Sequence, residues 1–459
     1  MIQLVPTLAA MAVAVAPVSA TAQAASPQLV GAWEGRVALG GQSIRVVFRI
    51  AGDGSALMDS PDQGAIGIPA ESPVVEGGVV RIGVPTIGGR FEGALSEDGQ
   101  TLTGALHQGG ASLPLVLERQ AAAAAPAALV RPQTPQPPFP YSEEEVAFDA
   151  GEGVRLAGTL TRPAGEGPFP AVLLITGSGA QDRDETVFGH KPFLVLADAL
   201  ARRGVAVLRL DDRGVGGSTG PLEDATTADF AGDSAAALGW LAARPGIDPA
   251  RLGLIGHSEG GTIAPLVAAD ASAPDPAFMV LMAGPAVPGG EVLTEQSRRF
   301  QTAQGLAPAV IDANVAVQAR LMQAVAANAG DKAAAAEAVR AVLTEAGAPA
   351  AAVEQGVQQT TSAWVRWFVA HDPRPSLAAV DVPVLALYGG KDFQVPADQN
   401  AEALRATLPG AEIVVLPELN HLMQTADTGL TDEYARIEET IAPAALEAIV
   451  DWVVARAGL

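Results

Sequence analysis

The sequence predicts an α/β protein with a mostly parallel sheet covered by helices on both faces. A helical cap is inserted into this part, and a small all-β domain precedes it. After about residue 141, continuous apolar runs of strand length alternate with helical stretches, as in a parallel sheet that is buried on both faces. Between residues 28 and 119, apolar and polar residues alternate with a period of two, which is typical of half-buried antiparallel strands.

Composition limits the classes of function. The chain has 459 residues, 49% of them hydrophobic and 17% charged, so it is globular and long enough for two or three domains. Its net charge of −23 argues against binding to nucleic acid or to an anionic membrane surface. Cysteine is absent, which excludes disulfides, thiolate catalysis and cysteine-based metal sites. We expect no metal site, and the sequence does not fix the oligomeric state.

Residues 1–22 are predicted to be a signal peptide. Leu4 to Val18 is a short apolar stretch, and Ala20-Thr21-Ala22 is a small-x-small cleavage site, although Ala22-Gln23-Ala24 fits equally well. The segment before the apolar stretch lacks Lys and Arg, which is unusual for a signal peptide. An uncleaved anchor is the alternative, but the stretch is too short to span a bilayer comfortably. We expect cleavage, export to the periplasm or beyond, and no membrane span in the mature protein.

Residues 28–119 are predicted to form a small antiparallel barrel or sandwich. Ile44, Val46, Phe48 and Ile50 would share one face of a strand. Asp53-Gly54 and Asp98-Gly99 are typical hairpin turns, and the further strands are expected at 79–84, 90–95, 101–106 and 113–117. A structural or docking module is the preferred interpretation over a ligand-binding cup. Residues 120–140, rich in Ala and Pro, should be an extended linker.

Residues 141–459 are predicted to be the catalytic domain. The expected buried strands are 171–175, 205–210, 252–255, 278–282, 384–388 and 413–416, and the expected helices include 193–203, 228–243 and 262–269. Strand signals stop between about 287 and 377, where the chain is Ala-rich and helical. A helical excursion at this point indicates a cap over the site.

The segment Gly256-His257-Ser258-Glu259-Gly260 follows the apolar run 252–255. A serine between two glycines after a buried strand is typical of the sharp strand-to-helix turn that exposes a nucleophilic hydroxyl. Both glycines are expected because side chains at 256 and 260 would collide across the turn. Ser258 is therefore the candidate nucleophile.

A serine needs a base, and that base needs an orienting acid. Of the five histidines, only His421 lies in a loop after a late strand, on the sheet edge expected to carry Ser258. Asp392, directly after the strand 384–388, fits the chain order of nucleophile, acid and base. Asp398 is the alternative acid, although a helix dipole alone would favour an acid at that position.

The expected oxyanion hole combines two backbone N–H groups. One is the amide of Glu259, and the other belongs to Ser178 or Gly179, in the loop after the strand 171–175. The carboxylate of Glu259 is expected only to complement a helix dipole.

Several other side chains have a structural interpretation that competes with a functional one. The helical stripe Trp364, Trp367, Phe368 and His371 is either core packing or the roof of an acyl pocket, and Trp364, Trp367 and Phe368 are the candidate pocket residues. The remaining expectations are an Asp212–Arg213 ion pair, an Arg183 that neutralises acidic neighbours, and a solvated Lys391.

With these residues placed, the region from about 141 to 459 resembles the α/β-hydrolase superfamily, and more narrowly the exported bacterial serine esterases with a β-rich N-terminal extension. The resemblance rests on Gly177 to Asp184, Asp212 to Gly216, Gly256 to Gly261, Gly389 to Asp392, Asn420-His421 and Thr428 to Tyr434. It implies carboxylester hydrolysis through an acyl-enzyme with Ser258, Asp392 and His421, and no cofactor. Thr176-Gly177 replaces the common His-Gly motif, which leaves the second oxyanion donor open.

The functional hypothesis is a secreted serine carboxylesterase that acts on small-molecule esters with small to medium acyl chains. The first alternative is a serine peptidase or aminopeptidase of the same fold. The second is a non-catalytic ligand-binding protein on a hydrolase scaffold, against which the complete set of nucleophile, acid and base argues.

Overall fold

The computed structural model describes residues 28–39, 42–52, 54–60, 65–84, 87, 89–108, 111–120 and 131–459. The predicted signal peptide, Asp53 and the alanine run of the linker lie outside these residues. The described chain divides into two compact units. One contains Pro132–Gly429 and Glu439–Leu459, and the other contains the β-rich region up to Arg131 with Leu430–Glu438, which includes α11 (Thr431–Tyr434).

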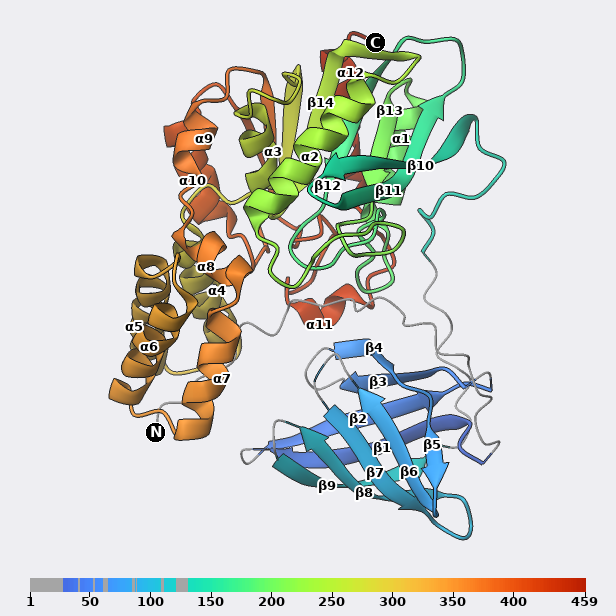
Figure 1. Cartoon of the computed structure of the whole chain (residues 1–459), viewed down its shortest axis with the longest axis vertical. Coiled ribbons are helices and arrows are strands. Elements are labelled where there is room, and N and C mark those ends of the chain that lie inside the picture. Colours follow the sequence, from blue (N-terminus) through green and yellow to red (C-terminus); the bar gives the residue numbers. More distant parts are fainter. Residues whose placement is uncertain are drawn as a thin grey trace. The chain divides into compact units, whose positions relative to one another are not determined.

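The β-rich unit is built on one antiparallel sheet that curls around a single core (Figure 1). Its inward side chains follow the predicted period of two, because Ile44, Val46, Phe48 and Ile50 are all buried. Trp33 is completely buried, and its indole N–H donates to the Leu29 carbonyl at 2.8 Å. The strands in the described residues, in the order β4-β3-β2-β1-β9-β8-β7-β6-β5, are β1 (Gly31–Leu39), β2 (Gln42–Ile50), β3 (Ala56–Ser60), β4 (Ala65–Ala70), β5 (Val74–Glu76), β6 (Val79–Val84), β7 (Gly89–Leu95), β8 (Thr101–Gln108) and β9 (Ala111–Arg119).

The second unit contains the predicted mostly parallel sheet, in the strand order β10-β11-β13-β12-β14-β15-β16-β17. Strands from β13 onward pair in parallel, whereas β10 and β11 form an antiparallel hairpin at one edge that the sequence analysis did not predict. The bounds are β10 (Tyr141–Gly151), β11 (Val154–Pro163), β12 (Phe169–Ile175), β13 (Ala206–Leu210), β14 (Ile247–His257), β15 (Phe278–Met282), β16 (Val384–Gly389) and β17 (Glu412–Leu416).

Helices cover both faces of this sheet, as predicted. α1 and α12 pack together on one face, and α2 and α3 pack together on the other (Figure 1). The bounds are α1 (Pro192–Arg202), α2 (Thr227–Ala242), α3 (Gly260–Ala268), α10 (Ala397–Thr407) and α12 (Pro443–Arg456). None of the helices in the described part of the chain has the length and hydropathy needed to span a membrane.

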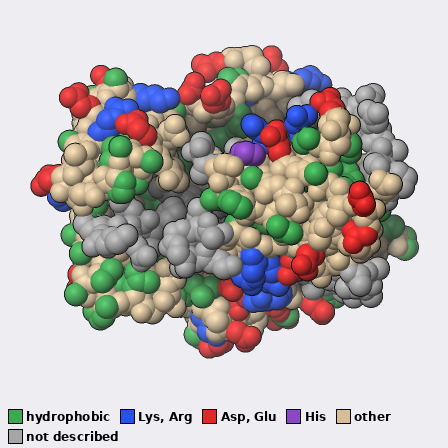
Figure 2. All heavy atoms as spheres, turned by 90° about the horizontal axis from the view of Figure 1, so that it is seen from below, with side chains coloured by type: hydrophobic (Ala, Val, Ile, Leu, Met, Phe, Trp, Pro, Cys, Tyr) green, Lys and Arg blue, Asp and Glu red, His purple; other side chains and the backbone are tan. Residues whose placement is uncertain are grey.

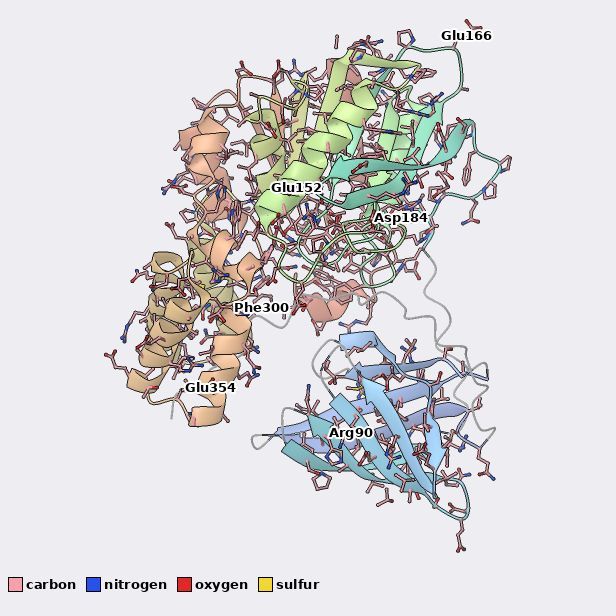
Figure 3. The ribbon with its side chains drawn as sticks, viewed as in Figure 1. Arg90, Glu152, Glu166, Asp184, Phe300 and Glu354 are labelled. Atoms are coloured by element: carbon pink, nitrogen blue, oxygen red, sulfur yellow. The ribbon has the colours of Figure 1, made fainter. Side chains whose placement is uncertain are left out.

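The helical cap lies between β15 and β16, close to its predicted limits. It has its own core, which includes Val325, Val339, Leu343 and Phe368. Asp331 and Ser362 accept backbone N–H bonds at the starts of two of its helices, as helix N-caps do. Figure 3 labels Phe300 on α4 and Glu354 on α7 of this cap. The helices between the two strands are α4 (Gly289–Ala303), α5 (Pro308–Ala327), α6 (Lys332–Glu345), α7 (Ala350–Thr360), α8 (Ala363–Ala370) and α9 (Arg374–Ala378).

Surface charges are arranged mainly as local pairs. In the cap, Arg298 contacts Asp312 at 2.9 Å and Arg340 contacts Glu354 at 2.8 Å. On the face shown in Figure 2, groups of Lys and Arg lie next to Asp or Glu side chains. Such exposed pairs contribute little to stability.

The predicted linker is attached to the second unit along its last residues. The side chain of Gln133 donates to the Ile441 carbonyl at 2.7 Å and accepts the backbone N–H groups of Thr440 and Ile441. This part of the linker is therefore held in place, whereas the sequence predicted a spacer without packed contacts.

Candidate active site

The turn around Ser258 joins β14 to α3. Ser258 has a φ of +53°, a left-handed conformation that is costly for a residue with a side chain and that recurs at functional sites. Its backbone N–H donates to Met282 O at 2.8 Å, at the end of the neighbouring strand β15. The half-buried side chain of Ser258 is thus held at the carboxyl edge of the parallel sheet.

Both glycines of the turn are required by close backbone contacts. A Cβ at Gly256 would lie 2.1 Å from Gly260 O, and a Cβ at Gly260 would lie 2.2 Å from Ile175 O on β12. The sequence predicted a collision between side chains at 256 and 260, whereas the first contact is between a side chain at 256 and the backbone of 260. The second shows that Gly260 also lets the turn approach the next strand.

Replacing Gly256 by alanine should therefore destabilise the second unit. The new methyl group would meet a backbone oxygen that cannot move without distorting the turn, so we expect a loss of about 3 kcal/mol in unfolding free energy. Gly232→Ala is the matched control, because Gly232 lies in α2 and an added Cβ there meets nothing within 4 Å. That change should stabilise the protein by about 0.5–1 kcal/mol. Denaturant unfolding followed by circular dichroism measures both; equal effects would contradict this explanation.

Asp392 and His421 are brought together from the ends of β16 and β17. His421 Nδ1 lies 2.8 Å from Asp392 Oδ2. Asp392 is 1% exposed, and its other oxygen accepts the backbone N–H groups of Gln394 and Val395 at 2.7 and 2.9 Å. A buried carboxylate with this many donors is fixed in orientation and, in turn, fixes the tautomer and direction of the imidazole ring.

Two histidines lie near Ser258, and their hydrogen bonds separate their roles. His257 Nδ1 lies 2.9 Å from Glu185 Oε1, and its Nε2 donates to the carbonyl of His421 at 3.0 Å. Both nitrogens of His257 are therefore committed. His421 uses only Nδ1, and its Nε2 bonds to no protein atom in the described residues, so His421 is the histidine able to accept a proton.

The link between Ser258 and His421 is indirect in this structure. The rings of His257 and His421 lie 4.9 Å apart, and His257 directly precedes Ser258. Within the described chain, no hydrogen bond joins the Ser258 hydroxyl to His421. Bonds of this kind are commonly long without substrate and shorten in the reactive complex.

The loop that follows β12 lies against the nucleophile. A Cβ built at Gly177 would be 3.2 Å from the Ser258 Cβ. The Gly177 N–H donates to Glu185 Oε1 at 2.7 Å and is thus occupied. In the described part of the protein, the backbone N–H groups of Ser178, Gly179 and Glu259 have no hydrogen-bond acceptor, so these three amides are available.

The side chain of Glu259 connects the turn to the cap. It is 2% exposed, and its Oε1 accepts the Thr227 hydroxyl at 2.5 Å and the indole N–H of Trp364, on α8, at 2.8 Å. Burial raises the pKa of Glu259, and the bonds from Thr227, Trp364 and Ser178 oppose that rise. The sequence predicts only a dipole role for this carboxylate and gives no sign of its contact with the cap.

The predicted aromatic stripe is split between two environments. Trp364 stacks on Phe368 with ring centroids 4.9 Å apart, and Phe368 is buried against α4. Trp367 stacks on His371 at 4.3 Å and lines a surface hollow together with Thr226 and Arg366. Of the predicted pocket residues, Trp364 is the one that bonds to the residue next to the nucleophile.

Acidic side chains surround the loop after β12. Asp212 accepts the Thr176 hydroxyl and the Gln181 N–H, both at 2.9 Å. Burial raises the pKa of Asp212 well above its usual range, and the negative charges of Glu259 and Glu185 raise it further. The two hydrogen bonds to Asp212 lower this pKa but do not cancel the rise. The site is therefore rich in carboxylates that are already satisfied by protein donors.

Contacts in the structure test the expectations for Arg183, Arg213 and Lys391. Arg183 pairs with Asp211 at 2.8 Å and with Glu145, so it neutralises acidic neighbours as expected. The expected ion pair between Asp212 and Arg213 is wrong, because Arg213 bonds to Asp233 at 2.7 Å.

Lys391 is not solvated as expected. Its ammonium group contacts the Glu418 carboxylate at 2.6 Å and the Ala426 carbonyl at 2.7 Å. Asp398, the alternative acid, lies in the first turn of α10 and pairs with Arg299 instead of a histidine.

Comparison with known proteins places this chain in a family. Residues 152–422, more than half of the chain, match the family described as X-Pro dipeptidyl-peptidase (S15 family), and this segment includes Ser258, Asp392 and His421. Esterase EstD of Thermotoga maritima is 28% identical over 320 residues, which cover 69% of this chain and 68% of that protein. The uncharacterized peptidase YuxL of Bacillus subtilis is 33% identical over 158 residues, covering 33% of this chain and 22% of that protein.

Among solved structures, the α/β hydrolase GrgF from Penicillium sp. sh18 is similar with a TM-score of 0.45 and 16% identity, over 69% of this chain and 100% of that one. An esterase of Pyrococcus furiosus gives a TM-score of 0.44 and 14% identity, over 69% and 91% of the two chains. The predicted fold class, an α/β-hydrolase sheet with a helical cap after a β-rich region, is confirmed. The chain belongs to the X-Pro dipeptidyl-peptidase (S15) family of α/β hydrolases.

Proposed function

We propose that this protein is a serine carboxylester hydrolase that works through an acyl-enzyme. Ser258 Oγ attacks the ester carbonyl while His421 Nε2 takes the hydroxyl proton, and Asp392 stabilises the imidazolium that forms. His421 then gives that proton to the departing alcohol oxygen. Water, deprotonated by the same imidazole, cleaves the acyl-enzyme and restores Ser258. The observation that carries this proposal is the Asp392–His421 bond of 2.8 Å, which leaves Nε2 of that ring uncommitted among the described residues. The His421 ring lies 4.9 Å from that of His257, the residue before the strained Ser258.

The tetrahedral intermediate needs donors for its oxyanion. We assign this role to the backbone N–H of Glu259 and to that of Ser178 or Gly179, which have no other acceptor among the described residues. The Gly177 amide is left out because Glu185 occupies it. Each such donor typically contributes about 10²–10³-fold to turnover.

Small to medium acyl chains are the proposed substrates, with Trp364 and Phe368 of α8 forming one wall of the acyl pocket. Support comes from the indole bond to Glu259, which holds this helix near the turn. The name of the Thermotoga relative, an esterase, points to the same reaction class. We also propose export to the periplasm or beyond, on the strength of the apolar stretch and small-x-small site in residues 1–22.

A peptidase is the second candidate, because the matching family is named for release of X-Pro dipeptides. The triad chemistry is the same for both, so only the substrate distinguishes them. We expect kcat/KM for nitrophenyl butyrate to exceed that for an X-Pro nitroanilide by at least about 100-fold. A chain-length series of nitrophenyl esters measured beside X-Pro and other aminoacyl anilides tests this. Faster cleavage of the X-Pro anilide than of every ester would favour the peptidase.

A further inference from the structure

One buried carboxylate near the site contacts two separate loops. Glu185 is 3% exposed and lies in the segment between β12 and α1, next to Asp184, which Figure 3 labels among the loops at the sheet edge. Its Oε1 accepts the Gly177 N–H at 2.7 Å and faces His257 Nδ1 at 2.9 Å. Glu185 has a φ of +51°, a strained backbone conformation at a position that delivers this carboxylate.

The connection continues through His257 to the candidate base. His257 Nε2 donates to the backbone carbonyl of His421 at 3.0 Å. The series Gly177–Glu185–His257–His421, which we call the brace, therefore joins the loop after β12, the nucleophile turn and the loop after β17. None of these hydrogen bonds uses the Ser258 hydroxyl, the Asp392 carboxylate or His421 Nε2.

The proton positions in the brace follow from its acceptors. A carbonyl oxygen can only accept, so Nε2 of His257 carries a proton, and Nδ1 faces a carboxylate that already accepts a backbone N–H. When both of its nitrogens are protonated, the ring forms an ion pair with Glu185. Burial by itself lowers the pKa of His257, but the charge and hydrogen bond of Glu185, the His421 carbonyl and the Asp392 charge outweigh it and raise the pKa.

We propose that Glu185 and His257 are positioning residues that hold the His421 loop and the Gly177 loop in register with Ser258. This inference rests on the proposed function, since it concerns the same triad. A misplacement of about 1 Å of a reacting group costs about 100-fold in rate. The brace acts on kcat because it orients the base and the oxyanion loop and touches no substrate.

Two substitutions at one position isolate the link to His421. His257→Gln places an amide where Nε2 stood and keeps the bond to the His421 carbonyl, whereas His257→Asn places its amide near Nδ1 and loses that bond. We expect kcat to fall about 100-fold in the Asn variant and about 10-fold in the Gln variant, with KM within about 3-fold of wild type in both.

Glu185→Gln should also lower kcat with little change in KM.

The matched control is His107, which faces Glu92 at 3.8 Å in the β-rich unit. His107→Gln and His107→Asn should keep wild-type kinetics. Thermal unfolding is recorded for every variant. Equal kcat losses in His257→Gln and His257→Asn, or losses that follow only the melting temperature, would overturn the positioning role.

A second readout does not depend on catalysis. In the full chain labelled with ¹⁵N-histidine, only five histidines contribute, and the His257 signals are those lost in His257→Gln. We expect the His257 ring to keep both protons to a higher pH than an ordinary imidazole does, and this difference to shrink in Glu185→Gln. A wild-type His257 ring that loses its second proton at or below the pH at which an ordinary imidazole does would overturn the ionic brace. A wild-type protein that cleaves no ester would instead count against the proposed function, and the spectrum would still report on the brace.

Discussion

Ester hydrolysis should fall by at least about 10⁴-fold when Ser258 is replaced by alanine, and labelling by a fluorophosphonate should be lost with it. The reason is chemical, because the proposed acyl-enzyme cannot form without the Oγ atom. The variant should fold normally, since the backbone bond from residue 258 to Met282 is kept and alanine has a smaller side chain in the strained turn.

The control for Ser258→Ala is Ser142→Ala, at an exposed position on β10. It should leave both kcat and labelling unchanged. Initial rates on nitrophenyl butyrate and a gel of fluorophosphonate-treated protein measure the two effects. Labelling that persists in Ser258→Ala would place the nucleophile elsewhere.

Asp392→Asn should lower kcat by about 10⁴-fold with little change in stability. The Asn oxygen can still accept the N–H groups of Gln394 and Val395. Its NH₂ group, however, would then face the Nδ1–H of His421, which places donor against donor. The ring must adopt the other tautomer, in which Nε2 carries the proton and can no longer accept one from Ser258.

Asp398→Asn is the matched control, because Asp398 lies six residues later and pairs with Arg299 near the surface. It should change kcat by less than about 2-fold, as expected for an exposed pair. A kcat loss in Asp398→Asn as large as that in Asp392→Asn would contradict the assignment of the acid.

The strands that the sequence predicted well are those buried on both faces. β15 was predicted residue for residue, because a continuous apolar run such as Phe278–Met282 has few other interpretations. β10 was missed because only one side of this edge strand is buried, and its run of three glutamates at 143–145 hides the alternation of Val146 and Phe148. Edge strands give weak sequence signals for this reason.

At the site, chain order and position after a strand were enough to select Ser258, Asp392 and His421 as candidates. The partners that support them were not predictable in the same way. Glu185 is 72 residues from His257, and Trp364 is 105 residues from Glu259. A loop acid that is buried and bonded has the same local sequence pattern as one that is solvated, so only the fold reveals which is which.

The hydrogen bond between Trp364 and Glu259 gives one helix of the cap a different role from the others. The cap is attached beside the nucleophile through α8, whereas α5, α6 and α7 make up most of its remaining length. Redesign of the cap for other substrates can therefore concentrate on residues 308–360. The indole at 364 should be kept, because its loss would leave a buried carboxylate short of a donor directly beside Ser258.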